Sequence, residues 1–273
     1  MSFGDITLNA GMRANLLNLQ STSALQIRTQ NRLSTGKKVN SAIDDAAAYF
    51  AAQAENQRAG DLNALKDSMN EAIQTLKAAD QGISAITKLL EQAKGLISQA
   101  RSASTADRAT LATQFDDLLT QITSVAGDAS YKGTNLLSAT GSLTVTFNEA
   151  GTSTLAITGF DASATTGLGI ATAAGSWATD ANITAASDAV AAALGTLRLQ
   201  GSALSSNSGV VQARIEFTAN MISTLTTGAG NLVNADLNEE GANMQALNVQ
   251  QQLGISALSL SSTAMQAVLK LFQ

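Results

Sequence analysis

The stretch LNALKDSMNEAIQTLKAADQGISAITKLLEQAKGLISQA, residues 62–100, decides the fold of this chain. Its apolar residues are spaced alternately by three and four positions, which places them along one side of a long helix in a heptad pattern. At about 1.5 Å per residue the helix would be about 58 Å long. The members of this stripe are Leu62, Leu65, Met69, Ala72, Leu76, Ala79, Ile83, Ile86, Leu90, Ala93, Ile97 and Ala100.

Two further stretches repeat the pattern, so we predict a mainly α fold built as an antiparallel bundle of long helices, a coiled coil. The longer of the two is interrupted by small or polar residues at Gly201, Ser208 and Thr218, which predicts close but weaker packing. Its members are Val190, Leu194, Leu197, Gly201, Leu204, Ser208, Val211, Ile215, Thr218, Ile222 and Leu225, and those of the shorter stripe are Leu111, Phe115, Leu118, Ile122 and Val125.

The spacing of apolar residues changes in a small insertion at about residues 139–182. Leu143, Val145 and Phe147 alternate with polar residues, and so do Leu155 and Ile157. Two such runs joined by a short Gly-containing segment predict a β-hairpin with one buried face. Residues 159–182 are rich in Gly, Ser, Thr and Ala, and we predict a loop there.

The two ends of the chain are almost free of charge. Residues 241–269 contain no charged side chain, and residues 6–27 contain only Arg13. A solvated helix carries charge on its outer face, whereas amides and hydroxyls suit a surface that is buried against other copies. We therefore expect both ends to become ordered on assembly; the alternative is that they cover each other within one subunit. The apolar stripe of the N-terminal end consists of Met12, Leu16, Leu19, Ala24 and Ile27. That of the C-terminal end consists of Ala246, Val249, Leu253, Ala257, Leu260, Ala264, Ala267 and Leu271.

The composition excludes several classes of function. The 273 residues contain no His, no Cys and no Pro, and the net charge is −5. The commonest general base, the soft metal ligands and thiol chemistry are absent, so we predict neither an enzyme nor a metal or cofactor site. Without clustered cations, nucleic acid is not an expected partner. No apolar run reaches 18 residues and the N-terminus lacks the pattern of a secretory signal peptide, so no membrane insertion is expected.

One short segment, RLSTGKKVNSAIDDAAAYF at residues 32–50, breaks the helical pattern. The adjacent acids Asp44 and Asp45 suggest either a metal or catalytic pair or the start of a helix. Ser41 and Asp44 have the spacing of a capping box, and acids favour the positive end of a helix dipole. We prefer the structural interpretation, with Asn40 and Ser41 capping the next helix, because no His or Cys is available to complete a reactive site.

This segment resembles the N-terminal signature of bacterial flagellins, roughly RLSSGxRINSAxDDAAG. The chain departs from it at Lys38, where arginine is usual, and at Ala48, where glycine is usual. The C-terminal half of the signature is similar to Ala242-Asn243-Met244, to Gln251-Gln252-Leu253-Gly254 and to Gln266-Ala267-Val268-Leu269, with Met265 in place of a common proline. SYKGTNLLS at 130–138 also looks like the turn that precedes the variable region of the family, and the short insertion is similar to that of small alphaproteobacterial flagellins.

The resemblance implies a structural protein that self-assembles into the helical flagellar filament, the extracellular propeller of swimming motility. Residues 1–40 with 236–273 would form the inner tube, an inner coiled-coil layer of terminal helices, and residues 41–235 the surrounding bundle. It also implies secretion in the unfolded state through the flagellar type III export apparatus. The implied partners are other copies, paralogous flagellins, an export chaperone, the filament cap and hook-associated proteins. A hook–filament junction protein of the same family is the alternative.

The resemblance also implies which residues contact other molecules. We expect Arg32, Lys37 and Lys38 to pair with acids of neighbouring subunits. On the face that animal innate immune receptors read on many flagellins, Gln92 and Gln114 replace an arginine and a glutamate, which predicts poor recognition; Leu90 and Leu96 match that face. The expected assembly residues are Leu16, Leu19, Arg32, Leu33, Lys37, Lys38, Asn40, Ser41, Asp44, Asp45, Asn243, Gln252, Leu253, Leu260 and Val268.

Overall fold

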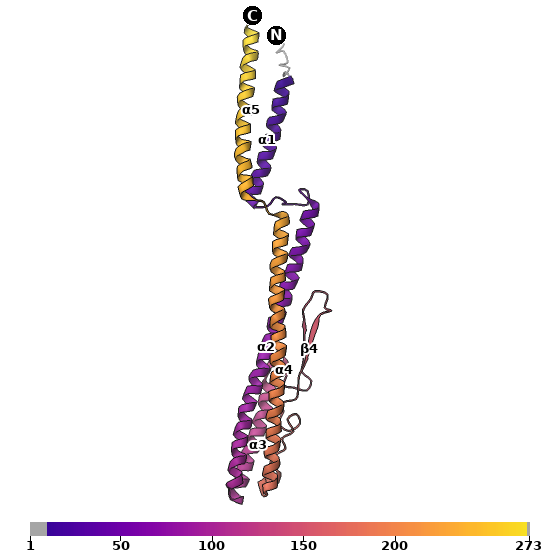
Figure 1. Cartoon of the computed structure of the whole chain (residues 1–273), viewed down its shortest axis with the longest axis vertical. Coiled ribbons are helices and arrows are strands. Elements are labelled where there is room, and N and C mark those ends of the chain that lie inside the picture. The colour runs from indigo at the N-terminus through magenta and orange to yellow at the C-terminus, as the bar shows by residue number, and fades with distance from the viewer. Residues whose placement is uncertain (1–9, 272–273) are drawn as a thin grey trace. The chain divides into compact units, whose positions relative to one another are not determined.

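The structure, a computed structural model, describes residues 10–271 (Figure 1). Contacts divide the chain into two compact units, Met1–Gln57 with Leu225–Gln273, and Arg58–Thr224. The helices are α1 (Ala10–Thr35), α2 (Ala46–Ser102), α3 (Thr105–Asp128), α4 (Asp180–Val233) and α5 (Leu237–Leu271). Two small antiparallel hairpins, β1 (Ser130–Tyr131) with β2 (Thr134–Asn135) and β3 (Ser142–Thr146) with β4 (Thr154–Thr158), complete the fold together with a 3-10 turn, η1 (Ala174–Trp177). The predicted mainly α fold with a small β-hairpin insertion is confirmed.

The core of the second unit forms along the predicted heptad stripes of α2 and α4. Every member of the α2 stripe is buried except Leu65, which is half-buried. The α4 stripe is buried or half-buried throughout, although Thr218 is polar. At Gly201 an added Cβ atom would lie 3.9 Å from Cγ2 of Ile83, an ordinary van der Waals distance, so the helices do not approach here more closely than an alanine would allow.

The stripe predicted for α3 is displaced by one position. Ala112, Leu119 and Ala126 are buried with the predicted Phe115 and Ile122, whereas Leu111, Leu118 and Val125 are only half-buried against the core. Apolar residues occupy both adjacent stripes, so α3 has a broad apolar face rather than a narrow heptad line. Spacing alone did not show which part of that face lies deepest.

The predicted β-hairpin is confirmed in β3 and β4. Leu143 pairs with Ile157 and Val145 with Leu155, and Val145 and Ile157 are buried against the helices. The smaller β1–β2 hairpin turns at Lys132 and Gly133, which both have positive φ angles, 47° and 83°. That is the conformation of a tight hairpin turn, in which glycine avoids a steric cost at its position.

The segment between β4 and α4 has little regular structure, as predicted, but it contributes to the core. Ala162, Ala164, Leu168 and Ile170 are buried there. Trp177 is fully buried, and its ring centroid lies 5.0 Å from that of Phe115. The sequence predicted a loop here but not its buried residues, because the apolar residues of this segment are widely spaced among Gly, Ser and Thr.

Candidate functional site

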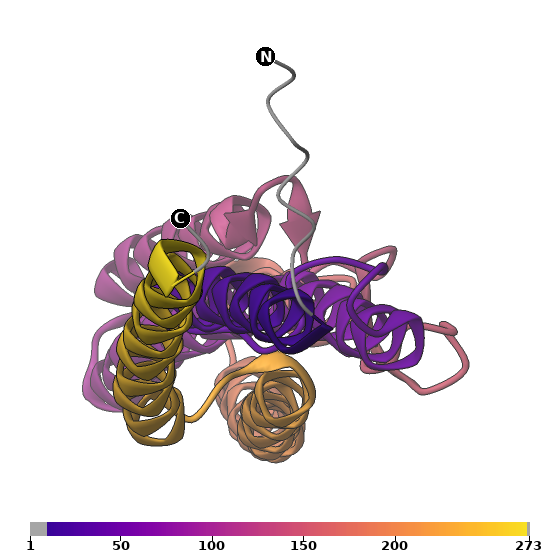
Figure 2. The ribbon, with the colours of Figure 1, turned by 90° about the horizontal axis from the view of Figure 1, so that it is seen from above.

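The terminal helices α1 and α5 pack side by side in the first unit (Figures 1 and 2). The contact is close at Gly254, where a Cβ atom would lie 2.8 Å from Cδ2 of Leu19. The amide of Gln26 donates a hydrogen bond to Oδ1 of Asn248. An open groove of about 540 Å³ runs between the helices, lined partly by Leu25 and Leu253. The two ends therefore do contact each other, which is the alternative the sequence left open.

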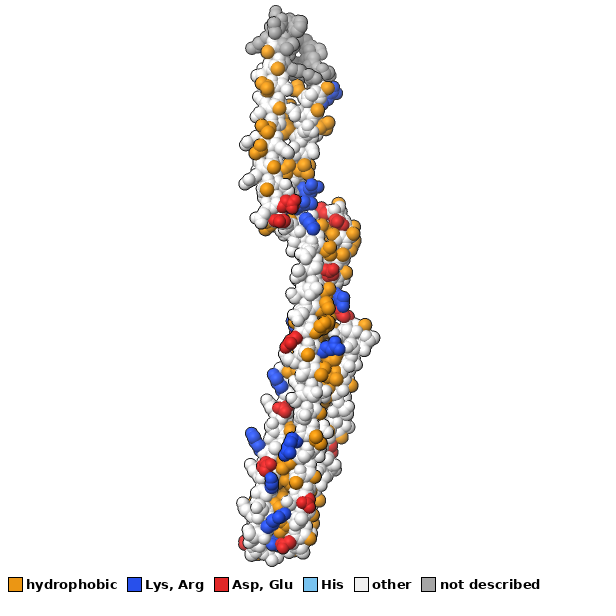
Figure 3. Space-filling model, in the orientation of Figure 1, with side chains coloured by type: hydrophobic (Ala, Val, Ile, Leu, Met, Phe, Trp, Pro, Cys, Tyr) orange, Lys and Arg blue, Asp and Glu red, His pale blue; other side chains and the backbone are white. Residues whose placement is uncertain are grey.

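That contact leaves an apolar stripe of α5 largely exposed, although Leu253 and Ala257 of this stripe also border the groove with α1. Val249, Leu253 and Leu260 are 56%, 65% and 74% exposed, while half-buried residues such as Met244 and Leu247 occupy another side of the helix. In Figure 3 the surfaces of α1 and α5 are white and orange, with few charged side chains. We call the following residues the α5 outer stripe: Ala246, Val249, Leu253, Ala257, Leu260 and Ala264.

Exposed apolar residues on α1 add to this surface. Leu16, Leu17 and Ile27 are exposed, whereas Leu19 and Leu33 are half-buried. Of the other predicted assembly residues, Asn243 and Gln252 are exposed on α5. Val268 belongs to α5, but its side chain lies outside the described part of the chain. One helix pair can cover only one side of each helix, and the remaining exposed apolar area is a candidate contact surface.

The connector between α1 and α2 is attached by its backbone to the segment between α4 and α5. Lys37 and Asn234 form an antiparallel bridge, the N–H of Lys38 donates to the carbonyl of Val233, and the N–H of Ala235 donates to that of Gly36. Gly36 has a φ angle of +69°, which glycine adopts readily. The boundaries predicted at residues 40 and 236 fall in these connectors, whereas the division by contacts falls inside α2 and α4.

The expected cations of the connector are mostly engaged within the chain. Nη1 of Arg32 lies 2.7 Å from Oε1 of Glu240, a buried acid in the first turn of α5. Nζ of Lys38 donates to the carbonyl of Asn231 at 3.2 Å. Within the subunit, Arg32 thus pairs with an acid 208 residues further along the same chain, a separation that no local motif reveals, and its pairing with a neighbouring subunit stays a prediction.

Asp44 and Asp45 organise the start of α2, as the structural interpretation predicts, but in different roles. Oδ2 of Asp44 accepts hydrogen bonds from the N–H of Asn40 and from the N–H and hydroxyl of Ser41, at 3.0, 3.0 and 3.1 Å. These hydrogen bonds, first that from Asn40 and then those from Ser41, hold the pKa of the Asp44 carboxyl below its usual range. Oδ1 of Asp45 accepts from the N–H of Ala48 at 3.0 Å, so Asp45 caps the helix.

The predicted capping by Asn40 and Ser41 is wrong, because α2 begins at Ala46 and both residues lie in the preceding turn. Between residues 10 and 271, no group of three or more acids could hold a metal ion.

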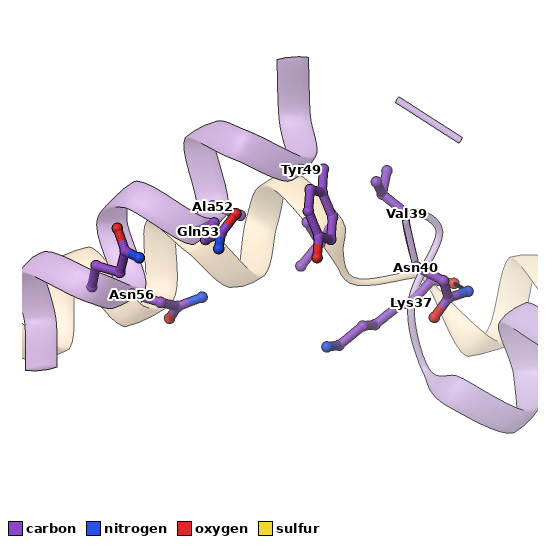
Figure 4. A pocket seen from close by; sticks show the side chains of 9 residues that line it. Lys37, Val39, Asn40, Tyr49, Ala52, Gln53 and Asn56 are labelled. Atoms are coloured by element: carbon purple, nitrogen blue, oxygen red, sulfur yellow. Dashed lines mark hydrogen bonds between the residues drawn. The ribbon is translucent and has the colours of Figure 1, made fainter. Parts of the chain in front are cut away.

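A hollow of about 380 Å³ lies beside the connector (Figure 4). Its lining includes the predicted Lys37 and Asn40, together with Tyr49, Gln53 and Asn56 of α2, which the sequence analysis did not single out. The lining mixes amides with the apolar side chains of Val39, Ala52 and Val233, and it holds no nucleophile beside a base. The hollow therefore resembles a mixed polar and apolar contact surface more than a catalytic cleft.

The residues expected on the receptor-recognition face are not all at the surface. Gln92 on α2 and Gln114 on α3 are exposed, and Leu96 is half-buried. Leu90 is fully buried in the heptad core, so its assignment to a receptor contact is wrong. A leucine that closes the bundle of its own subunit cannot also present its side chain to another protein.

Long helices, exposed apolar ends and a polar connector together define a structural, assembly-forming protein. A family model for the bacterial flagellin N-terminal helical region matches residues 6–142, and one for the C-terminal helical region matches residues 187–272. The chain belongs to the bacterial flagellins. Membership supports the role of a filament subunit in an extracellular appendage. In the described residues no helix is long and apolar enough to cross a membrane.

Several relatives match over their whole length. Flagellin FljM of Caulobacter vibrioides is 33% identical over 100% of both chains. The flagellin of Brucella melitensis is 29% identical, covering 98% of this chain and 99% of the relative. A crystal structure of Bacillus cereus flagellin overlaps with a TM-score of 0.49 at 16% identity, covering 55% of this chain and 88% of that one.

Proposed function

We propose that the chain is the structural subunit of a flagellar filament and that its terminal helices drive polymerisation. The α5 outer stripe carries this proposal, because it is apolar, exposed in the single subunit and free of charge from residue 241 to 269. Fully burying one leucine side chain is worth about 1.5–3 kcal/mol, so several such residues favour assembly strongly. Other copies are the partner that the flagellin family implies.

We also propose that the chain crosses the cell envelope unfolded through the flagellar export apparatus, with an export chaperone, and folds outside beneath the filament cap. Its composition supports this route. Without cysteine no disulfide delays unfolding, and without proline no isomerisation lasting roughly tens of seconds slows folding at the filament tip. The swimming function of the filament and a mixed filament with paralogous flagellins belong to the same proposal.

Seeded polymerisation tests this proposal. Filaments dissociated by heat or acid are returned to neutral pH with short seeds and followed by electron microscopy. Long uniform filaments support a filament subunit; a soluble species that never elongates on seeds would instead favour the hook–filament junction protein.

Three variants separate assembly from folding. Leu253→Asp places a charge on the α5 outer stripe and should stop elongation while the helicity of the monomer is kept. Gln74→Asp, on an exposed position of α2, is the matched control and should elongate normally. Ile83→Asp buries a charge in the core of the subunit and should unfold the monomer itself. Loss of monomer helicity in Leu253→Asp would contradict the assignment of this surface to assembly.

A further inference from the structure

The segment that leads into α4 has a backbone conformation that is rare for L-amino acids. Gly175, Ser176 and Trp177 follow one another with positive φ angles of 54°, 50° and 54°, so together they form a short left-handed turn in η1. Left-handed backbone normally occurs at single residues, most often glycine, because the Cβ atom comes too close to the following carbonyl oxygen. Two of these three residues carry a Cβ atom. The turn is therefore strained and persists only because contacts elsewhere hold it.

One side chain attaches this turn to the core. Trp177 is fully buried, and its ring centroid lies 5.0 Å from that of Phe115 on α3. Every other residue from 174 to 180 is exposed. The indole nitrogen Nε1 is buried and has no hydrogen-bond partner among residues 10–271. The apolar contact of the ring thus favours the observed turn, while the unpaired indole N–H and the left-handed backbone oppose it.

Polar contacts on either side of the turn join α3 to the start of α4. Oδ1 of Asp116 on α3 accepts a hydrogen bond from the N–H of Ala173 at 2.8 Å. Nδ2 of Asn182 on α4 donates a hydrogen bond to the carbonyl of Ala174 at 3.0 Å. The segment therefore bridges the two helices as long as the turn keeps its position.

An ion pair joins the same two helices directly, but it is mostly solvated. Nη2 of Arg108 on α3 lies 2.8 Å from Oδ1 of Asp180, the first residue of α4, and the Asp180 side chain is 84% exposed. Exposed ion pairs contribute little to stability, because water and salt screen them. The bridge thus depends mainly on the burial of Trp177.

We propose that residues 173–179 form a latch that opens and closes while the helices of the second unit stay folded. In the closed state Trp177 packs on Phe115 and the latch ties α3 to the start of α4. In the open state the tryptophan leaves the core, the turn relaxes to right-handed or extended backbone, and the tie is lost. Because backbone strain and an unpaired polar group oppose a single apolar anchor, opening should require much less free energy than unfolding of the bundle. The latch gives the unit two conformations, which differ in whether α3 and α4 are joined at this end.

Hydrogen exchange of the full-length monomer tests the latch. Trp177 is the only tryptophan in the chain, so its indole N–H gives a single NMR signal. The protection of this proton should be at least about 100-fold lower than that of core amides of α2 such as Ile86, and low concentrations of urea should leave it unchanged, because a local opening exposes little surface. Equal protection of both sites with the same urea dependence would overturn the proposal, because the segment would then open only when the whole unit unfolds.

Two substitutions should shift the opening in opposite directions. Ser176→Gly removes a Cβ atom from the left-handed turn and should raise the protection of the indole N–H at least about threefold. Gly175→Ala adds a Cβ atom at a positive φ and 3.3 Å from Nδ2 of Asn182, so it should lower that protection at least about threefold. Gly151→Ala is the matched control: Gly151 also has a positive φ, 68°, but it lies between β3 and β4, and the indole protection should not change. An indole proton that responds to neither latch substitution, or that responds equally to Gly151→Ala, would refute the latch.

Discussion

Replacing glycine by alanine should affect the stability of the protein differently at two positions of the same helix. Gly82 and Gly95 both lie inside α2, where replacing glycine by alanine favours the helix by about 1 kcal/mol. At Gly95 no atom lies within 4 Å of an added Cβ. At Gly82 the added Cβ would lie 2.5 Å from Cδ1 of Leu137 and 2.7 Å from Cβ of Ala129. Leu137 can rotate away, but Ala129 can move only with its backbone.

The magnitudes follow from these distances. Gly95→Ala should stabilise the second unit by about 1 kcal/mol. Overpacking a core costs about 1–3 kcal/mol, so Gly82→Ala should be between neutral and about 2 kcal/mol less stable than the unmodified protein. The two variants should thus differ by about 1–3 kcal/mol, which corresponds to roughly 2–12 °C in melting temperature for a domain of this size.

Thermal unfolding of the two monomers, followed by circular dichroism, measures the difference. Equal stabilisation by both substitutions would refute the reasoning, because it would mean that the segment carrying Ala129 and Leu137 does not approach α2 at Gly82.

Three further predictions concern the connector and the receptor face. Asp44→Asn should speed amide exchange of the connector turn at neutral pH. Because the pKa of Asp44 is lowered in the fold, the contribution of its carboxylate to stability is present above the pKa of the unfolded chain and is lost as pH falls through the lower folded value. The exchange rates of variant and parent should therefore converge in acid. Arg32→Ala leaves the buried Glu240 unpaired and should destabilise the first unit by roughly 1–3 kcal/mol in urea unfolding, and Glu240→Leu in the same chain should recover much of the loss. The monomer should activate an innate immune reporter weakly, and Gln92→Arg should raise the signal; full activation by the unmodified monomer would contradict the receptor prediction.

Periodicity predicted the parts of the fold that depend on local spacing. The heptad stripes of α2 and α4 identified their core residues, since a helix that is buried on one side must repeat at that interval. The alternation of Leu143 and Val145 likewise predicted the hairpin. Each of these patterns repeats several times along the chain, so a single exceptional residue does not obscure it.

Features that depend on distant residues could not be predicted in this way. The partner of Arg32 is Glu240, and the buried position of Trp177 depends on Phe115 of another helix. Start positions were also uncertain, because Ser41 and Asp45 are both good capping residues and only the backbone geometry decides between them. The assignment of Leu90 to a receptor face was wrong for a related reason: aligning a short motif does not show which side of the helix is outside.

The buried position of Trp177 has a practical consequence. It is the only tryptophan in the chain, and neither α1 nor α5 contains tryptophan or tyrosine. Intrinsic tryptophan emission therefore reports on the interior of the second unit, while light scattering of the same sample reports on the growth of filaments. A variant of the terminal helices that loses scattering but keeps a blue, shielded emission has lost assembly alone. One cuvette can thus separate a folding defect from a polymerisation defect.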